Sequence, residues 1–274
     1  MTATTVTPIG LTPDLDLRGV RRFTTAVGDT FAVMARNLIA YRRVPQLLVF
    51  STIQPVVFVL LFRYVFGGAI STPGVPYVDY LMPGIFAQTV AFGALNTSIG
   101  LSTDMQAGLI ERFRSLPMAR SAVLAGRTLA DLVRNVFVVG LMFVVGFAVG
   151  WRIHTNVFAL AGAVLLVLLF GYALSWVFAT VGLIVADPEA AQAADFPVMA
   201  PLVFASSAFV PIATMPSWLQ PFAEHQPVSV VVDAVRDLTT GGPTSGDVLG
   251  AIAWIVGIIA VCAPISVACY RRAV

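Results

Sequence analysis

The feature that most restricts the fold of this chain is a series of apolar runs, each long enough to cross a lipid bilayer as a helix. A spanning helix needs about 20 mostly apolar residues. In lipid, every backbone polar group must find a partner within the protein, which favours helices. The chain is therefore predicted to be an all-α polytopic membrane protein with six transmembrane helices, at residues 46–66, 80–101, 128–149, 157–186, 193–212 and 248–270.

The composition agrees with this prediction, because 58% of the residues are hydrophobic and only 11% are charged. Soluble domains carry about 25% charged residues. The fifth run is interrupted by Pro197, Pro201 and Pro211. Membrane helices tolerate such breaks where neighbouring groups satisfy the freed backbone atoms, so we keep this run as a predicted span.

The placement of arginine predicts the orientation of the chain in the membrane. Cytoplasmic loops are enriched in basic residues, and all 16 basic residues here are arginine. They concentrate before the first run, after the second run and at the C-terminus, whereas the opposite side holds only Arg63, Arg152 and Arg236. Both termini, including residues 271–274, are expected in the cytoplasm. The acidic segment 187–195 contains no arginine but is expected to be a cytoplasmic loop.

The N-terminal region is expected to contain a disordered cytoplasmic tail at residues 1–19 and one amphipathic helix at residues 20–44. Apolar residues recur in the helix at steps of three and four, and arginines occupy the other side. The helix is too polar to span, so it should lie in the membrane interface with its arginines toward anionic headgroups. The residues expected to define its faces are Phe23, Phe31, Arg36, Arg42 and Arg43.

The complete absence of lysine excludes one class of function for this polypeptide. A P-loop places its lysine on the β- and γ-phosphates of a nucleotide. The chain therefore cannot hold an orthodox nucleotide-hydrolysing domain. If ATP drives its work, we expect ATP and Mg²⁺ to be bound by a partner, with no cofactor in this chain.

The loop at residues 102–120 combines charged residues with a short apolar stripe that fits one side of a short helix. Such a loop could be a solvated loop, could lie on the lipid headgroups, or could dock a soluble partner. Docking is favoured because the chain lacks a motor of its own. The residues expected to take part are Met105, Leu109, Glu111, Arg112, Phe113, Arg114 and Pro117.

Catalytic and metal-binding functions have little support in the sequence. The two histidines, His154 and His225, have no Cys or His at metal-ligand spacing. Ionisable groups at mid-membrane depth mark ion and proton pathways, but Arg63, Asp131 and Arg134 all fall near the ends of the predicted spans. These patterns disfavour an enzyme or an ion carrier and favour a lipophilic or amphipathic cargo. Nucleic acid is not an expected partner.

Uncharged polar residues occur inside the first two spans. Gln54 precedes Pro55 in the first, and the second places Gln88, Phe92 and Asn96 at steps of four on one helix face. This face could line a cargo path or bond across a helix contact. The candidate path residues are Gln54, Phe58, Gln88, Phe92 and Asn96.

The region at residues 211–247 is the largest segment expected on the outer side. Valines at helical spacing and a closing Gly241-Gly242 predict a short amphipathic helix near residues 228–238. Two short helices re-entering the outer leaflet explain the region better than a free loop. Trp218, Phe222 and His225 are its candidate outer-gate residues, since aromatic side chains suit the membrane boundary.

Two segments resemble a known family. AGLIERFRSLPMARSAVLAGRTLADLVR, at residues 107–134, resembles the loop after the second helix of type-2 ABC export permeases, in particular the daunorubicin-resistance-type transmembrane subunits. FVPIATMPSWLQPFAEHQPVSVVVDAVRDLTTGG, at residues 209–242, resembles the outer region of the same branch. The chain departs from the family in its Arg-free acidic segment and at His225-Gln226, where many members carry Asn.

The resemblance implies a multidrug, antibiotic or lipid exporter in a bacterial inner membrane, built from two permeases and two separate ATPase subunits. The second permease would be another copy or a paralogue. Residues 102–120 would form a coupling helix in an ATPase groove, and residues 20–44 the interfacial helix. Cargo would pass between the permeases along the first, second and fifth spans. The open alternative is a membrane-embedded immunity or scaffold protein that binds a lipophilic ligand without ATP-driven transport.

Overall fold

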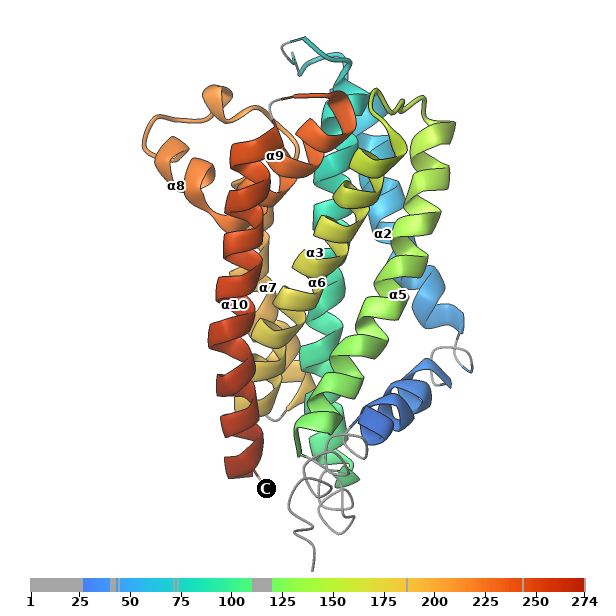
Figure 1. Cartoon of the computed structure of the whole chain (residues 1–274), viewed down its shortest axis with the longest axis vertical. Helices are drawn as coiled ribbons and strands as arrows, with labels where there is room; N and C mark the ends of the chain where they lie inside the picture. The colour runs from blue at the N-terminus through green and yellow to red at the C-terminus, as the bar shows by residue number, and fades with distance from the viewer. Residues whose placement is uncertain are drawn as a thin grey trace, which may run out of the picture.

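The computed structural model describes residues 27–39, 43, 45–70, 72, 74–109, 120–185, 187–242 and 244–273. Across these ranges the regular structure is helical and no strand is present. The long helices run side by side as one bundle (Figure 1). This confirms the predicted fold class, an all-α polytopic membrane protein.

Four helices of the described part are long and apolar enough to cross a membrane. A helix of 30 residues, the length of the observed α3 (Tyr77–Gln106), is about 45 Å long, which exceeds the ~30 Å hydrocarbon core of a bilayer. The second and sixth predicted spans extend at both ends, the third extends at its start, and the fourth matches its helix to within one residue. The four helices are α3 (Tyr77–Gln106), α5 (Arg120–Ala148), α6 (Val157–Val185) and α10 (Thr244–Ala273).

The first and fifth predicted spans are formed by shorter helices. α2 (Pro45–Leu60) continues without a break into the π-helix Leu61–Phe66, and together they cover the first predicted run. α7 (Pro188–Phe204) has 17 residues and ends well before position 212. Neither helix is among the four that are both long enough and apolar enough to cross a membrane. The total of six transmembrane helices therefore stays a prediction.

The acidic segment at 187–195 was expected to be a loop, and this expectation is wrong. Asp187 accepts a hydrogen bond from the Ala190 amide at 2.9 Å and caps α7, with Pro188 at the first helical position. Aspartate is a favoured N-cap and proline a favoured first residue. The rest of the segment therefore forms the first two turns of α7, including Asp195.

α3 is the central helix of the bundle. It packs against α5, α6, α7 and α9, and almost all of its first half is buried. Two glycines allow this close packing, because a Cβ atom on Gly84 would overlap the Ala208 carbonyl and one on Gly182 of α6 would overlap the Ser98 backbone. The core of the molecule therefore lies around the first half of α3.

The segment at residues 211–240 forms short helices at the end of the bundle away from the C-terminus (Figure 1). They are the 3-10 helix Ile212–Thr214, α8 (Gln220–His225) and α9 (Pro227–Thr240). The valine stripe of α9 is buried, and Gly241, with φ +90°, ends the helix. The predicted amphipathic helix is thus present, while its re-entry into a lipid leaflet stays a prediction.

The helical segment at residues 27–39 lies at the same end of the bundle as the C-terminus and runs obliquely to the long helices (Figure 1). It packs on α5, where a Cβ atom on Gly126 would lie 2.7 Å from the Thr30 carbonyl oxygen and from Val33 Cβ. Val33 is buried, whereas Phe31 is exposed. One side of the segment therefore contacts the bundle and the other is free to meet an interface.

Candidate functional site

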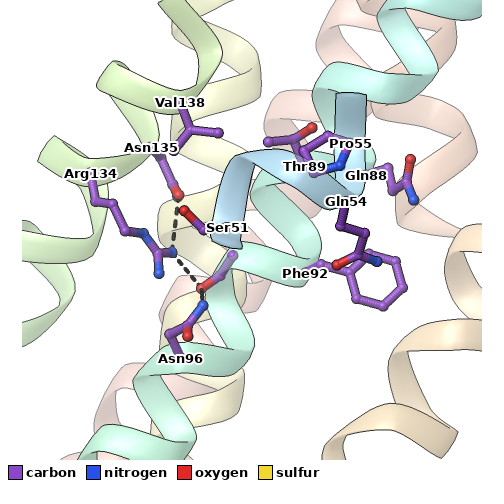
Figure 2. A pocket seen from close by; sticks show the side chains of 11 residues that line it. Ser51, Gln54, Pro55, Gln88, Thr89, Phe92, Asn96, Arg134, Asn135 and Val138 are labelled. Carbon is purple, nitrogen blue, oxygen red and sulfur yellow. Dashed lines mark hydrogen bonds between the residues drawn. The ribbon is translucent and has the colours of Figure 1, made fainter. Parts of the chain in front are cut away.

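A polar pocket of about 70 Å³ lies among α2, α3 and α5 (Figure 2). The structure brings four of the five candidate path residues to it: Gln54 from α2, and Gln88, Phe92 and Asn96 from α3. The prediction that these α3 residues share one face is confirmed, although contact with cargo stays a prediction. The other residues that line the pocket are Ser51, Pro55, Thr89, Gly93, Arg134, Asn135 and Val138.

Phe58, the fifth candidate, does not line this pocket. Its ring belongs to an aromatic cluster at the end of α7, with centroid distances of 6.0 Å to Phe62, Phe204 and Phe209. Phe62 and Phe209 stack more closely, at 4.5 Å. Phe58 therefore joins α2 to the segment after α7 by packing.

Arg134 was expected near the end of a span, and its depth in the membrane stays a prediction, but it does not lie near the end of its helix. α5 begins at Arg120, eight residues before the predicted span, so Arg134 lies at the midpoint of the helix. Its side chain is buried, and Nη2 donates to the Gly93 carbonyl oxygen at 2.5 Å and to Asn135 Oδ1 at 3.2 Å. Gly93 makes room for this arrangement, because a Cβ atom there would lie 2.9 Å from Arg134 Nη2.

Two amides of this pocket carry polar atoms that have no hydrogen-bond partner among the described residues. They are Gln88 Oε1, an acceptor, and Asn135 Nδ2, a donor. Both residues are buried, and an unsatisfied buried polar group costs about 1–3 kcal/mol. Asn135 Nδ2 faces α6, because a Cβ atom on Gly171 would lie 3.0 Å from it.

A second cavity, of about 350 Å³, adjoins the first and shares Gln54, Phe92 and Asn96 with it. Its remaining lining comes from α3 and α7. The two cavities together form a continuous surface from Arg134 on α5 to Asp195 on α7. The residues found only in the second cavity are Leu95, Ile99, Gln192, Asp195 and Phe196.

Sequence reasoning missed Arg134, Asn135 and Asp195 as lining residues of these cavities. Arg134 and Asn135 form an adjacent charged and amide pair within an apolar helix, a pattern that marks functional positions in membrane helices. The signal for Asp195 was the Asp-Pro helix start at Asp187-Pro188, which places position 195 on a helix rather than in a loop.

Of the candidate docking residues, the structure describes Met105 and Leu109. Met105 packs against a buried cluster that includes Leu101, Leu124 and Trp176. α3 ends at Gln106, and Gly108 follows with φ +65°. The other candidates, Glu111, Arg112, Phe113, Arg114 and Pro117, lie outside the described residues.

Asp104 joins three elements just before this turn. Its Oδ2 atom accepts from Arg36 at 3.1 Å and from Arg127 at 3.4 Å. Arg36 belongs to the helical segment 27–39, and Arg127 belongs to α5. Of the other interfacial-helix candidates, Phe31 and Arg43 are exposed, while Phe23 and Arg42 lie outside the described residues.

The three candidate outer-gate residues are exposed on or beside α8. Trp218 is 77% exposed, Phe222 is 47% exposed, and His225 Nδ1 lies 2.9 Å from the Pro221 carbonyl oxygen. The next residue, Gln226, is instead buried, and its Nε2 donates to the Leu202 carbonyl at 2.8 Å and the Ala205 carbonyl at 3.1 Å. Gln226 therefore satisfies carbonyl groups that the end of α7 leaves free.

Comparisons with known proteins agree on one kind of protein. A family model described as ABC-2 type transporter matches residues 29–239. The chain is similar to the daunorubicin resistance ABC transporter permease protein DrrB1 of Streptomyces coeruleorubidus, with 33% identity over 248 residues that cover 90% of this chain and 88% of that protein. A probable doxorubicin resistance ABC transporter permease protein DrrC of Mycobacterium tuberculosis (strain ATCC 25618 / H37Rv) is 28% identical over 255 residues, 90% of each chain.

A putative transport permease, ycf38 of Cyanophora paradoxa, is 26% identical over 216 residues, which are 77% of this chain and 74% of that protein. The stretch matched by the family model includes α2, α3, α5 and α7. Every residue that lines the two cavities therefore falls within the shared region.

Proposed function

Because the chain belongs to the ABC-2 type transporter family, we propose that it is the permease subunit of an ATP-driven exporter of a lipophilic or amphipathic molecule. Two relatives that cover 90% of this chain are named as permeases for resistance to daunorubicin or doxorubicin. A drug, a lipid or a glycolipid of comparable character is the proposed cargo.

The observation that carries this proposal is the pair of adjoining cavities between α2, α3, α5 and α7. Their shared residues, Gln54, Phe92 and Asn96, combine two amides with an aromatic ring. Binding sites for small molecules combine apolar surface with a few placed polar groups, and the larger cavity has both, with Phe92, Leu95, Ile99 and Phe196 beside its amides. The proposed path, between this chain and a second permease copy or paralogue, runs along these cavities.

The energy is proposed to come from separate ABC ATPase subunits that bind ATP and Mg²⁺. A chain without lysine has no orthodox P-loop of its own. Two such subunits would dock the loop at residues 102–120 through Glu111, Arg112, Phe113, Arg114 and Pro117. The Asp104 ion pairs support this assignment, because they tie the end of α3 to α5 and to the segment 27–39.

The proposed setting is the inner membrane of a bacterial cell, with both termini in the cytoplasm. Residues 20–44 would form the interfacial helix and residues 46–270 the transmembrane domain. The exposed Trp218, Phe222 and His225 would then belong to an outer gate. In this arrangement, cargo enters at the end of the bundle that carries the C-terminus and leaves near α8 and α9.

Inverted membrane vesicles test the proposal. They contain this chain with the ABC ATPase that co-purifies with it, and the uptake of fluorescent daunorubicin is followed with and without ATP. Uptake that requires ATP, this chain and the ATPase together is the expected result. Daunorubicin binding without any ATP-dependent uptake would overturn the transporter proposal and support a membrane-embedded ligand-binding protein.

A further inference from the structure

Asp195 is a buried carboxylate with no counter-ion among the residues that the structure describes. The residue is 1% exposed, and neither carboxylate oxygen has a hydrogen-bond partner among the described residues. The Ser98 hydroxyl on α3 lies beside this carboxylate, but it too has no hydrogen-bond partner among the described residues. Burying a carboxylate is costly unless a cation or several donors compensate it.

Asp195 also lies within the bundle rather than at its surface. It is seven residues after Pro188, which places it about 10 Å along α7 from the start of the helix. Ionisable residues at such positions in membrane proteins serve functions by default, and their partners identify the function. Here the structure supplies no ionic partner within the described part of the chain.

The carboxylate lines the 350 Å³ cavity, and the other residues that line this cavity are uncharged. Phe92 and Phe196 form an aromatic pair there, with ring centroids 6.4 Å apart. Gln54, Asn96 and Gln192 supply amides. Arg134 belongs to the adjoining pocket, where it donates to Gly93 and Asn135. A molecule in the larger cavity thus meets one negative charge beside two aromatic rings.

We propose that Asp195 binds a protonated amine of the cargo, which makes this chain selective for lipophilic amines over their neutral counterparts. This inference rests on the proposed function, since it names the class of cargo for the same cavities. A protonated amine supplies the missing counter-charge, and aromatic faces attract organic cations. A bound metal ion fits less well, because the described residues contain no cluster of three or more metal-ligating side chains.

Two probes that differ by one charge test the inference. Dansylcadaverine carries a primary amine, and its N-acetyl derivative is neutral but otherwise similar. Binding of each probe is measured by fluorescence titration with the full chain in lipid nanodiscs, without ATP or ATPase. Wild-type protein should bind the amine roughly tenfold more tightly than the neutral probe, which corresponds to about 1.4 kcal/mol of binding free energy.

Asp195→Asn should bind the two probes with similar affinity, and Asp195→Glu should retain part of the preference for the amine. The matched control is Glu189→Gln, which removes a carboxylate from the same helix at an exposed position outside both cavities. Thermal unfolding in the same nanodiscs shows that each variant is folded.

The inference is overturned if wild-type protein does not prefer the amine, or if Asp195→Asn keeps the preference. Failure of the proposed function has a different signature. In that case the amine preference and its loss in Asp195→Asn persist in nanodiscs, while vesicles that contain the ATPase accumulate neither probe on addition of ATP.

Discussion

The guanidinium carbon of Arg236 lies 3.7 Å from the centre of the Tyr80 ring, which fastens α9 to the first turn of α3. The same guanidinium donates to the Ser207 carbonyl at 2.7 Å and pairs with Asp233. Ser207 in turn donates to Asp233 at 2.7 Å and accepts from the Tyr80 hydroxyl through its carbonyl at 3.0 Å. One arginine therefore connects α3, α9 and the segment that follows α7.

Arg236→Lys should destabilise the protein by about 1–2 kcal/mol, because an ammonium group cannot stack on the ring and donate along two directions as a planar guanidinium does. The measurement is thermal unfolding in nanodiscs, followed by intrinsic fluorescence. Arg152→Lys is the control, since the Arg152 side chain is exposed and, among the described residues, donates to the Trp151 carbonyl alone. Equal midpoints for the two variants would show that the Arg236 stacking contributes little.

Gly84→Ala should disrupt the packing of α3. The added methyl group would overlap the Ala208 carbonyl, and a backbone atom cannot move aside as a flexible side chain can. Overpacking of this kind costs about 1–3 kcal/mol or more. Gly257→Ala provides the matched control in α10, because no atom lies within 4 Å of a Cβ atom there. The control should be neutral or stabilised by up to about 1 kcal/mol, since alanine favours helix more than glycine does.

Both variants are measured by the yield of monodisperse protein and by thermal unfolding. An unchanged unfolding midpoint in Gly84→Ala would contradict the close approach of α3 to the segment after α7.

The free energy of unfolding should rise as the pH falls from about 7.5 to 5, in part because the Asp237 carboxyl takes up a proton. Burial, followed by the neighbouring Asp247, raises the pKa of the Asp237 carboxyl above its ordinary value, to about 6. A raised carboxyl pKa means that the folded state binds the proton more tightly than the unfolded state. The destabilisation is therefore present above pH 6 and disappears as the pH falls toward 4.

Because Asp237 is partly exposed, solvent screening limits this effect to about 1 kcal/mol or less. Asp237→Asn should raise the unfolding midpoint at pH 7.5 and flatten its dependence on pH. The check is a series of thermal unfolding curves between pH 5 and 7.5 for both proteins. Parallel curves for the two proteins would assign the pH dependence to other groups.

Asp104→Asn should weaken the link between ATP hydrolysis and transport more than it weakens cargo binding. The substitution removes the negative charge that Arg36 and Arg127 share, so the end of α3 is held less firmly to α5 and to the segment 27–39. ATP-dependent daunorubicin uptake should fall several-fold, while the Kd for daunorubicin stays within about twofold, less than 0.5 kcal/mol.

Uptake and binding are measured with the same preparation. Glu224→Gln is the control, because Glu224 is exposed on α8 near the other end of the bundle. Parallel losses of binding and uptake in Asp104→Asn would argue against a coupling role.

The parts of the fold that follow from local periodicity could be predicted from the sequence. The valine stripe of α9 and the Gln88, Phe92 and Asn96 face of α3 depend only on spacing along one helix, and both are present. α7 was misplaced because its acidic first turns lowered the local hydropathy, although Asp187 and Pro188 signal a helix start.

The contacts of Arg134 and Phe58 could not be predicted in this way, since they depend on how separate helices meet. Hydropathy placed the start of the third span at residue 128, but α5 extends back to Arg120 and so moves Arg134 to mid-helix. Phe58 shares a helix with Gln54, yet its ring packs on Phe204 and Phe209 from a distant part of the sequence. Sequence spacing identifies a face, but tertiary packing decides what that face meets.

Gln54→Leu should impair transport without destabilising the protein. Gln54 is the one α2 residue that lines both cavities, and leucine keeps the size of the side chain while removing its hydrogen-bonding amide. Loss of a hydrogen bond to cargo costs about 0.5–1.5 kcal/mol. The KM for ATP-dependent daunorubicin uptake should therefore rise about 2- to 13-fold, with kcat and the unfolding midpoint little changed. Val57→Leu is the control, because Val57 is exposed on α2 and lines neither cavity. An unchanged KM in Gln54→Leu would place the cargo path elsewhere in the bundle.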